Sequence, residues 1–137
     1  MFFKKNKKED EDKNFVKIAS LLIHAAKIDE NFSKTEEKII TEALLKLGAE
    51  NESLESIIKA GKLMEENANQ ILDFTREVKN MDENKKIQII ETLWQIIYSN
   101  KEADIYETNL MRRLAGLLYV DNKTMGDIKE KIKKENS

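Results

Sequence analysis

Two short segments of the chain concentrate oxygen-bearing side chains at spacings that suit a hard cation. Such side chains lie within nine positions in the first segment and within eight in the second. Ca²⁺ and Mg²⁺ bind several oxygens, and a loop that leads into a helix can gather them. The first segment contains Asp29, Glu30, Asn31, Ser33, Glu36 and Glu37, and the second contains Asn100, Glu102, Asp104 and Glu107. The candidate metal ligands are Asp29, Asn31, Glu36, Glu102, Asp104 and Glu107, and the candidate ions are Ca²⁺, Mg²⁺ and Zn²⁺.

The same acids also fit a purely structural role at the starts of helices. Ser33 and Glu36 have the spacing of a capping box, and Asp104 and Glu107 repeat it. Acids in a first helical turn are favoured by the helix dipole without any ion. The ligand pattern of an EF-hand is absent. Two compatible interpretations therefore stay open: the acids bind an ion, or they only cap helices.

The two acidic segments are related by a shift of 71 positions along the chain. That shift places Ala26–Glu37 on Ile97–Thr108. The apolar residues before the segments match in kind, since Ile18, Leu22, Ile23 and Ala26 correspond to Ile89, Leu93, Trp94 and Ile97. The pattern predicts two copies of a helix–acidic loop–helix unit with a connector between them.

Composition and periodicity predict an all-α fold. The 137 residues include no proline, the strongest helix breaker, and only four glycines. Apolar residues recur at i, i+3, i+4 and i+7 along most of the chain. We predict a compact bundle of about seven helices with an internal pseudo-two-fold repeat. The helical domain is expected over residues 14–134, between a charged N-terminal tail (1–13) and a short C-terminal tail (135–137).

Residues that commonly begin or end helices give the expected boundaries. The first helix is expected over 14–28, and Gly48 is expected in a left-handed conformation after the second helix. A fifth helix over 83–99 is apolar around most of its circumference, so it is expected at the centre, packed against the first. The expected N-caps are Ser33, Asn51 or Ser53, Asp82, Asp104 and Asp121.

The main ring side chains are expected to serve packing. His24 is the single histidine, and Leu21 stands three residues before it, so the Glu-x-x-His pattern of di-iron bundles is absent. We expect His24 to be a partly buried packing residue. Trp94 and Phe74 lie on apolar stripes and are expected in the core.

Composition argues against several classes of function. One histidine, no cysteine and no glycine-rich phosphate loop leave little material for nucleophilic catalysis, so no enzymatic activity is expected. A formal net charge of −2 provides no basic field for nucleic acid. No segment resembles a signal peptide or a membrane span, and the lack of cysteine fits a cytoplasmic location. Phe2 and Phe3, beside lysines, allow at most a weak peripheral contact with an anionic membrane.

The two acidic segments, taken with their flanks, resemble a known family. The shared pattern is an alanine-rich helix end, an A-x-A-D-G-x-Φ-x-x-x-E loop (Φ apolar), and a second copy about seventy residues later. The first copy keeps Ala26, Asp29, Phe32 and Glu36, and the second keeps Glu102, Ala103, Asp104, Tyr106 and Glu107. From about Phe15 to Lys131 the chain is similar to the tellurite resistance protein TerB-like domain.

This resemblance implies a seven-helix, pseudo-symmetric fold and a bacterial protein linked to stress and tellurite resistance, cytoplasmic or associated with the inner membrane. It also implies that the loop acids form a metal-binding surface. The chain departs from the pattern at Glu30 and Lys101, which replace glycine, and at Asn100, which replaces an aspartate. Because Asn100 carries no charge, any second ion site should bind more weakly.

Two hypotheses about function follow. In the first, a small non-enzymatic module uses its paired acidic loops to bind a divalent cation or a basic surface of a protein partner. In the second, the acids only cap helices, and an apolar groove binds a partner helix without any ion.

Overall fold

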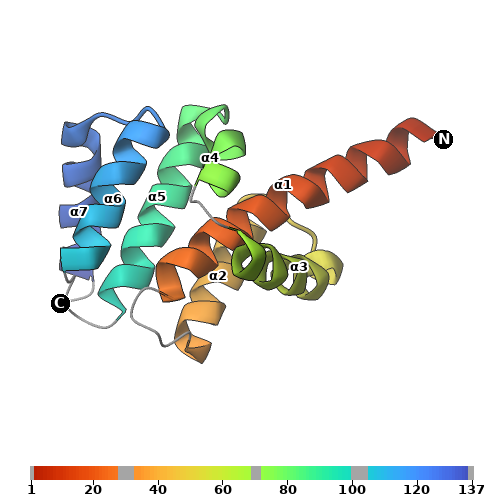
Figure 1. Ribbon diagram of the computed structural model, residues 1–137, viewed down its shortest axis with the longest axis horizontal. Coiled ribbons are helices and arrows are strands. Elements are labelled where there is room, and N and C mark those ends of the chain that lie inside the picture. Colours follow the sequence, from red (N-terminus) through yellow and green to blue (C-terminus); the bar gives the residue numbers. More distant parts are fainter. Residues whose placement is uncertain (1, 28–32, 69–71, 100–104, 136–137) are drawn as a thin grey trace.

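The computed structural model describes residues 2–27, 33–68, 72–99 and 105–135. In these residues the chain forms seven α-helices and no strand, so the predicted all-α class is confirmed (Figure 1). The helices are α1 (Phe2–Ala26), α2 (Lys34–Lys46), α3 (Leu54–Asn67), α4 (Leu72–Lys79), α5 (Glu83–Tyr98), α6 (Ile105–Leu117) and α7 (Asn122–Glu135), and a short 3-10 helix, η2 (Asn51–Ser53), precedes α3. None of the described helices has both the length and the apolar character needed to cross a membrane. The internal pseudo-two-fold relation stays a prediction.

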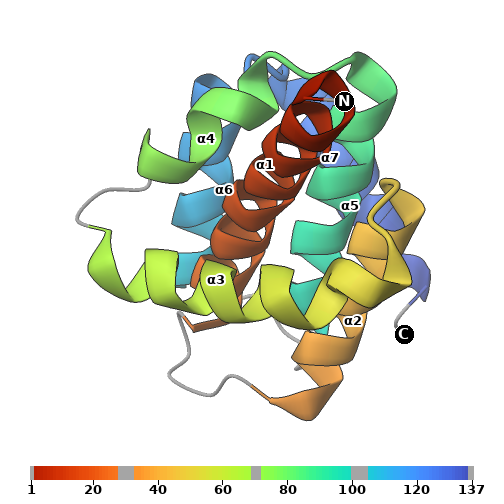
Figure 2. The same cartoon turned by 90° about the vertical axis from the view of Figure 1, so that its right-hand side faces the viewer.

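Helix α1 holds the bundle together because it packs against α2, α3, α4 and α5. Helix α5 packs against α1, α2 and α7, which confirms the expected contact between the first and fifth helices. In Figure 2, α3 crosses α1 on one side while α5 lies on the other.

The expected start of the first helix at residue 14 was wrong, since α1 begins at Phe2 and its N-terminal part extends beyond the bundle (Figure 1). Charged residues at these positions still allow helical backbone, because Lys and Glu are good helix formers.

Three of the expected N-caps are present. Ser33 accepts a hydrogen bond from the backbone of Glu36, as a cap should. Asp82 Oδ1 accepts from the N–H of Lys85 at 2.9 Å, and Asp121 Oδ1 accepts from the N–H of Thr124 at 2.7 Å. Each bond satisfies a backbone donor that has no partner inside its helix. Asp104 lies outside the described residues.

Of the two residues expected to cap the third helix, Ser53 is the N-cap residue of α3, but its side chain does not form the expected capping bond. The other residue, Asn51, lies inside η2. The N-cap residue of η2 is Glu50, whose side chain makes no capping bond either. The tight 3-10 turn leads directly into α3, so it supplies the helical start that a side chain was expected to supply.

Two helices end in the same way. Gly48 follows α2 with φ +111°, and the N–H groups of Gly48 and Ala49 bond back to Leu45 and Leu44, as expected for a left-handed C′ residue. Helix α6 ends in the same bond pattern, but here the residue with positive φ (58°) is Tyr119. A bulky residue such as tyrosine rarely adopts this backbone conformation. Lys79 Nζ lies 5.5 Å from the centre of the Tyr119 ring. The left-handed backbone at Tyr119 was not predicted from the sequence, because the usual signal for such a turn is glycine.

Helices α1 and α3 cross at Gly61, which has no side chain. A Cβ added at Gly61 would lie 3.0 Å from Ala19 Cβ and 3.4 Å from the backbone nitrogen of Ser20. The buried Ser20 hydroxyl lies 3.1 Å from the carbonyl oxygen of Gly61 and 2.8 Å from that of Val16, and it can donate to either. The crossing therefore combines close backbone approach with a hydrogen bond between the two helices.

We predict that Gly61→Leu lowers the free energy of unfolding by about 1–3 kcal/mol, because the new side chain must push α3 away from α1. Urea denaturation followed by circular dichroism measures the change. Gly116→Leu is the matched control, since a Cβ at this helical glycine meets nothing within 4 Å. Equal stability of the two variants would contradict the close crossing.

Candidate functional site

The two acidic segments join helices at one end of the bundle. Helices α1 and α5 end there, and helices α2 and α6 begin there (lower end of Figure 1). Two of the six predicted metal ligands, Glu36 and Glu107, are described by the structure. The other four, Asp29, Asn31, Glu102 and Asp104, lie outside the described residues.

Glu36 lies in the first turn of α2 and its side chain is buried, with 2% of the residue exposed. Its Oε1 accepts hydrogen bonds from the N–H and from the hydroxyl of Ser33, both at 3.0 Å. In return, the N–H of Glu36 donates to Ser33 Oγ at 3.2 Å. The predicted capping box is therefore confirmed, and it gives one Glu36 oxygen a structural role.

Glu107 occupies the corresponding place in the first turn of α6 and is also buried, with 5% exposed. The negative charge of Glu107 acts on Tyr98, which lies at the end of α5. Burial is the main cause that raises the pKa of the Tyr98 hydroxyl, and the negative charges of Glu130 and Glu107 raise it further. Two carboxylates with little access to water thus lie in the first turns of α2 and α6, where the acidic segments end. Burial of a carboxylate is costly unless it is paired or hydrogen-bonded.

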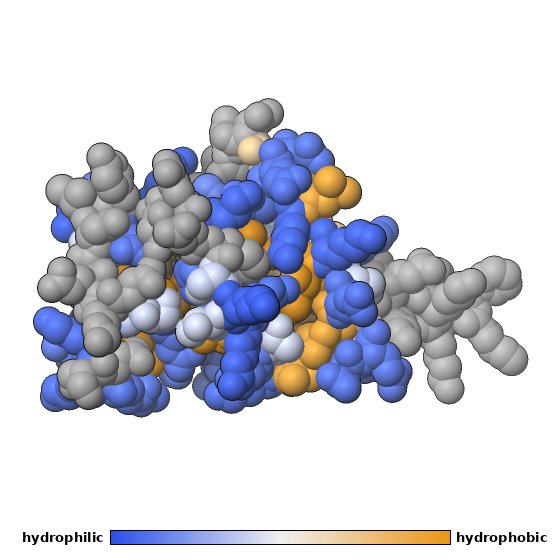
Figure 3. Space-filling view, turned by 90° about the horizontal axis from the view of Figure 1, so that it is seen from below, coloured by the Kyte–Doolittle hydropathy of each residue, from blue (hydrophilic) through white to orange (hydrophobic). Residues whose placement is uncertain are grey.

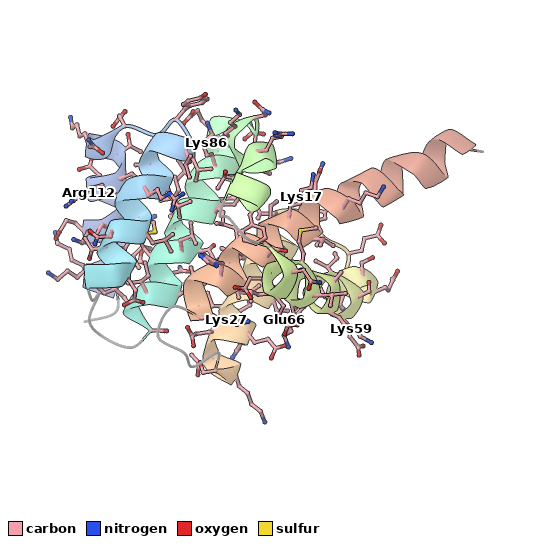
Figure 4. All side chains as sticks on the ribbon, viewed as in Figure 1. Lys17, Lys27, Lys59, Glu66, Lys86 and Arg112 are labelled. Carbon is pink, nitrogen blue, oxygen red and sulfur yellow. The ribbon has the colours of Figure 1, made fainter. Side chains whose placement is uncertain are left out.

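A third acid at this end, Glu65 near the end of α3, was not among the predicted ligands. Its Oε2 accepts from Lys27 Nζ at 2.8 Å, and its Oε1 lies 3.3 Å from His24 Nδ1. The hydrogen bond to Glu65 is the main cause that raises the pKa of Lys27, and the charge of Glu66 adds to it. Figure 4 labels Lys27 and Glu66 near the same end of α1 and α3. No local pattern could have revealed the contact, since Glu65 lies 38 positions from Lys27 and 41 from His24.

Comparison with known proteins decides the family. The family model for the tellurite resistance protein TerB matches residues 15–130. The chain belongs to the TerB family. The match spans nearly the whole helical domain and confirms the resemblance read from the two acidic segments. No curated protein and no solved structure matches the chain at a significant level.

The ring side chains of this TerB-family chain lie where the sequence predicted them. Phe74 and Trp94 are buried, with 1% and 3% exposed. His24 is partly buried, and its ring centre lies 5.9 Å from that of Phe74. Among the described residues no three His, Asp or Glu side chains form a group that could hold a metal ion. A complete cation site at this end would therefore need ligands from residues 28–32 or 100–104.

Removing the cap of α2 should destabilise the TerB fold. We predict that Ser33→Ala lowers the free energy of unfolding by about 1 kcal/mol, because both the backbone of Glu36 and its carboxylate lose a partner. Thermal or urea denaturation measures this change. The control is Ser56→Ala, since the Ser56 hydroxyl only donates to the Ser53 carbonyl. If both variants unfold alike, the capping box does not stabilise the helix.

The contacts of Glu65 should contribute less to the free energy of unfolding than the cap of α2 does, because Lys27 and His24 are both partly exposed. We predict that Glu65→Gln costs roughly 0.5–1 kcal/mol at low ionic strength and less at high salt, as screening weakens the pairs. Glu66→Gln is the neighbouring control and should cost less. A loss for Glu65→Gln that does not change with salt would show that the contact is not electrostatic.

Proposed function

We propose that this TerB-family chain is a non-enzymatic binding module that binds a divalent cation or a basic partner surface at its acidic end. The observation that carries the proposal is the placement of Glu36 and Glu107. Both are buried carboxylates in the first turns of helices that begin at the same end of the bundle, and each lies near the C-terminal end of its acidic segment. Residues that end α3 add further acids there, Glu65 and Glu66.

Electrostatics supports a cationic ligand at this end. Like charges gathered near low-dielectric protein raise the local concentration of ions of opposite charge. Residues 26–37 contain four acids and two lysines, and residues 97–108 contain three acids and one lysine, so each segment has a formal net charge of −2. One of these lysines, Lys27, pairs with Glu65. A divalent cation or lysine side chains of a partner would neutralise the net charge.

A binding role fits the residues better than catalysis does. The single histidine has its Nδ1 within 3.3 Å of Glu65 and its ring beside Phe74, which makes it a packing and pairing residue. The chain has no cysteine. The family is described as tellurite resistance protein TerB, and on that description we extend the proposal to a role in bacterial stress response in the cytoplasm, with a protein as the partner.

A second candidate function is supported by an apolar groove between α1 and α3. The groove has a volume of about 490 Å³ and is lined by Val16, Ala60, Leu63, Met64, Asn67 and Ala68. Leu63 is 61% exposed, so it presents a large apolar side chain at the surface of the groove. On the face seen in Figure 3, hydrophilic side chains cover much of the described surface, and the hydrophobic side chains gather in a smaller part of it. In this alternative the groove binds a partner helix, and the loop acids only cap helices as Ser33 and Glu36 do.

The first candidate predicts that a divalent cation raises the melting temperature. An ion at 100 times its Kd adds about 2.7 kcal/mol, which corresponds to roughly 9 °C for a chain of this length. The measurement compares protein in EDTA with protein in millimolar Ca²⁺, Mg²⁺, Mn²⁺ or Zn²⁺. Asp29→Asn should remove the shift without unfolding the protein, and Asn100→Asp should enlarge it.

Glu83→Gln is the control, because Glu83 is an exposed acid at the start of α5, whereas the acidic end lies where α5 ends. Its shift should equal that of the wild type. If no ion changes the melting curve, the cation half of the proposal fails and the basic partner surface remains to be tested. An unchanged shift in Asp29→Asn would place the ion elsewhere.

The second candidate predicts a different dependence. Binding of a protein partner in a pull-down should survive both EDTA and Asp29→Asn, and it should be lost in Leu63→Lys, which places a charge in the groove. Leu45→Lys is the control, since Leu45 is an exposed apolar residue on α2 outside the groove. Loss of binding in Asp29→Asn with retention in Leu63→Lys would return the site to the acidic end.

A further inference from the structure

A separate pocket lies between α5, α6 and α7. Its volume is about 230 Å³. Four of the residues that line it are almost fully buried and apolar or aromatic, namely Trp94, Met111, Ala115 and Met125. Arg112, labelled on α6 in Figure 4, and Lys129 on α7 are more exposed and carry the charge. The pocket thus combines an apolar floor with a cationic rim.

The charge of the rim has one sign. Of the described residues that line the pocket, the two charged ones are Arg112 and Lys129, and none is an acid. Lys129 Nζ lies 5.5 Å from the centre of a Trp94 ring, so the indole face helps to hold the ammonium group at the pocket. In a chain whose formal net charge is −2, two cations around one apolar pocket select for an anion.

Trp94 carries a cost that the fold alone does not explain. Its Nε1–H is buried and has no hydrogen-bond acceptor among the described residues. A buried donor without a partner costs about 1–3 kcal/mol. An aliphatic core side chain such as Ile23, which is fully buried in α1, carries no such cost. A large flat ring beside a pocket is well suited to contact an apolar ligand.

We propose that this pocket binds a small organic anion with an apolar body, such as an aryl or alkyl carboxylate of about ten heavy atoms. The apolar body contacts Trp94 and the two methionines, and the carboxylate pairs with Lys129 and Arg112. The volume of about 230 Å³ is below the roughly 300 Å³ at which pockets for drug-sized ligands begin, which favours ligands smaller than a nucleotide. The large apolar side chains that are exposed in the described residues are Leu45, Leu63 and Tyr119, and none lines this pocket. These residues therefore do not extend the pocket into a larger exposed apolar patch of the kind that marks a protein interface, and we infer a small molecule as the ligand.

The chain provides a direct reporter, because Trp94 is its only tryptophan and gives a single indole N–H resonance in a ¹H–¹⁵N spectrum. The probes are 3-phenylpropionate, 3-phenyl-1-propanol and 3-phenylpropylamine, which share a body and differ in charge. We expect 3-phenylpropionate to shift the indole resonance saturably in the millimolar range. The alcohol should bind about fivefold more weakly, the ratio expected for a partly exposed ion pair, and the amine more weakly still.

Two variants locate the site. Gly126→Leu should abolish the shift, because Gly126 lines the pocket and a Cβ there meets nothing within 4 Å, so the new side chain fills the space without disturbing the fold. Gly116→Leu on α6 is the matched control and should bind normally, since Gly116 does not line the pocket. Lys129→Gln should remove most of the preference for the carboxylate over the alcohol.

Three results would overturn the proposal. These are a resonance that none of the probes moves, equal affinity for all three probes, or unchanged binding in Gly126→Leu. The proposal does not rest on cation binding at the acidic end, and neither result decides the other.

Discussion

The fold depends on the close crossing of α1 and α3 at Gly61. Any larger residue would meet Ala19 and the backbone of Ser20, and the hydroxyl of Ser20 adds a hydrogen bond across the two helices. Helix α1 also packs against α2, α4 and α5. The crossing therefore fixes the position of a helix that contacts four others. It also positions the end of α1, where Lys27 and His24 meet Glu65 of α3. The chemistry of the acidic end is therefore linked to the packing of the core.

Features that depend on a few neighbouring residues could be predicted from the sequence. The spacing of Ser33 and Glu36 was enough to predict a capping box, and Gly48 was enough to predict a left-handed turn, because each involves a single helical turn. Features set by distant residues could not be predicted in this way. The pairing of Glu65 with Lys27 depends on how two helices cross, and Tyr119 adopts a conformation that its residue type disfavours. The helical state of residues 2–13 was missed because that part of α1 has no apolar stripe.

The capping role of Glu36 is compatible with the proposed binding role at the acidic end. Glu36 uses Oε1 to satisfy Ser33, which stabilises α2 and removes part of the cost of burying a carboxylate. The same bonds fix the carboxylate at the start of the helix, next to the acidic segment. In the proposed binding role, a ligand would contact a carboxylate that these bonds already hold in place, which would lower the entropy cost of binding. The cap and the binding role are thus compatible, as the spacing of the residues suggested.

Mapping of ligand contacts along the backbone tests the central claim most directly. Amide resonances of the whole chain are followed by NMR while Ca²⁺, Mg²⁺, Zn²⁺ or a lysine-rich peptide is added. The account predicts saturable shifts in the first turns of α2 and α6, around Glu36 and Glu107, with little change at the other end of the bundle. Shifts confined to the groove between α1 and α3, or no shift with any of these ligands, would contradict it.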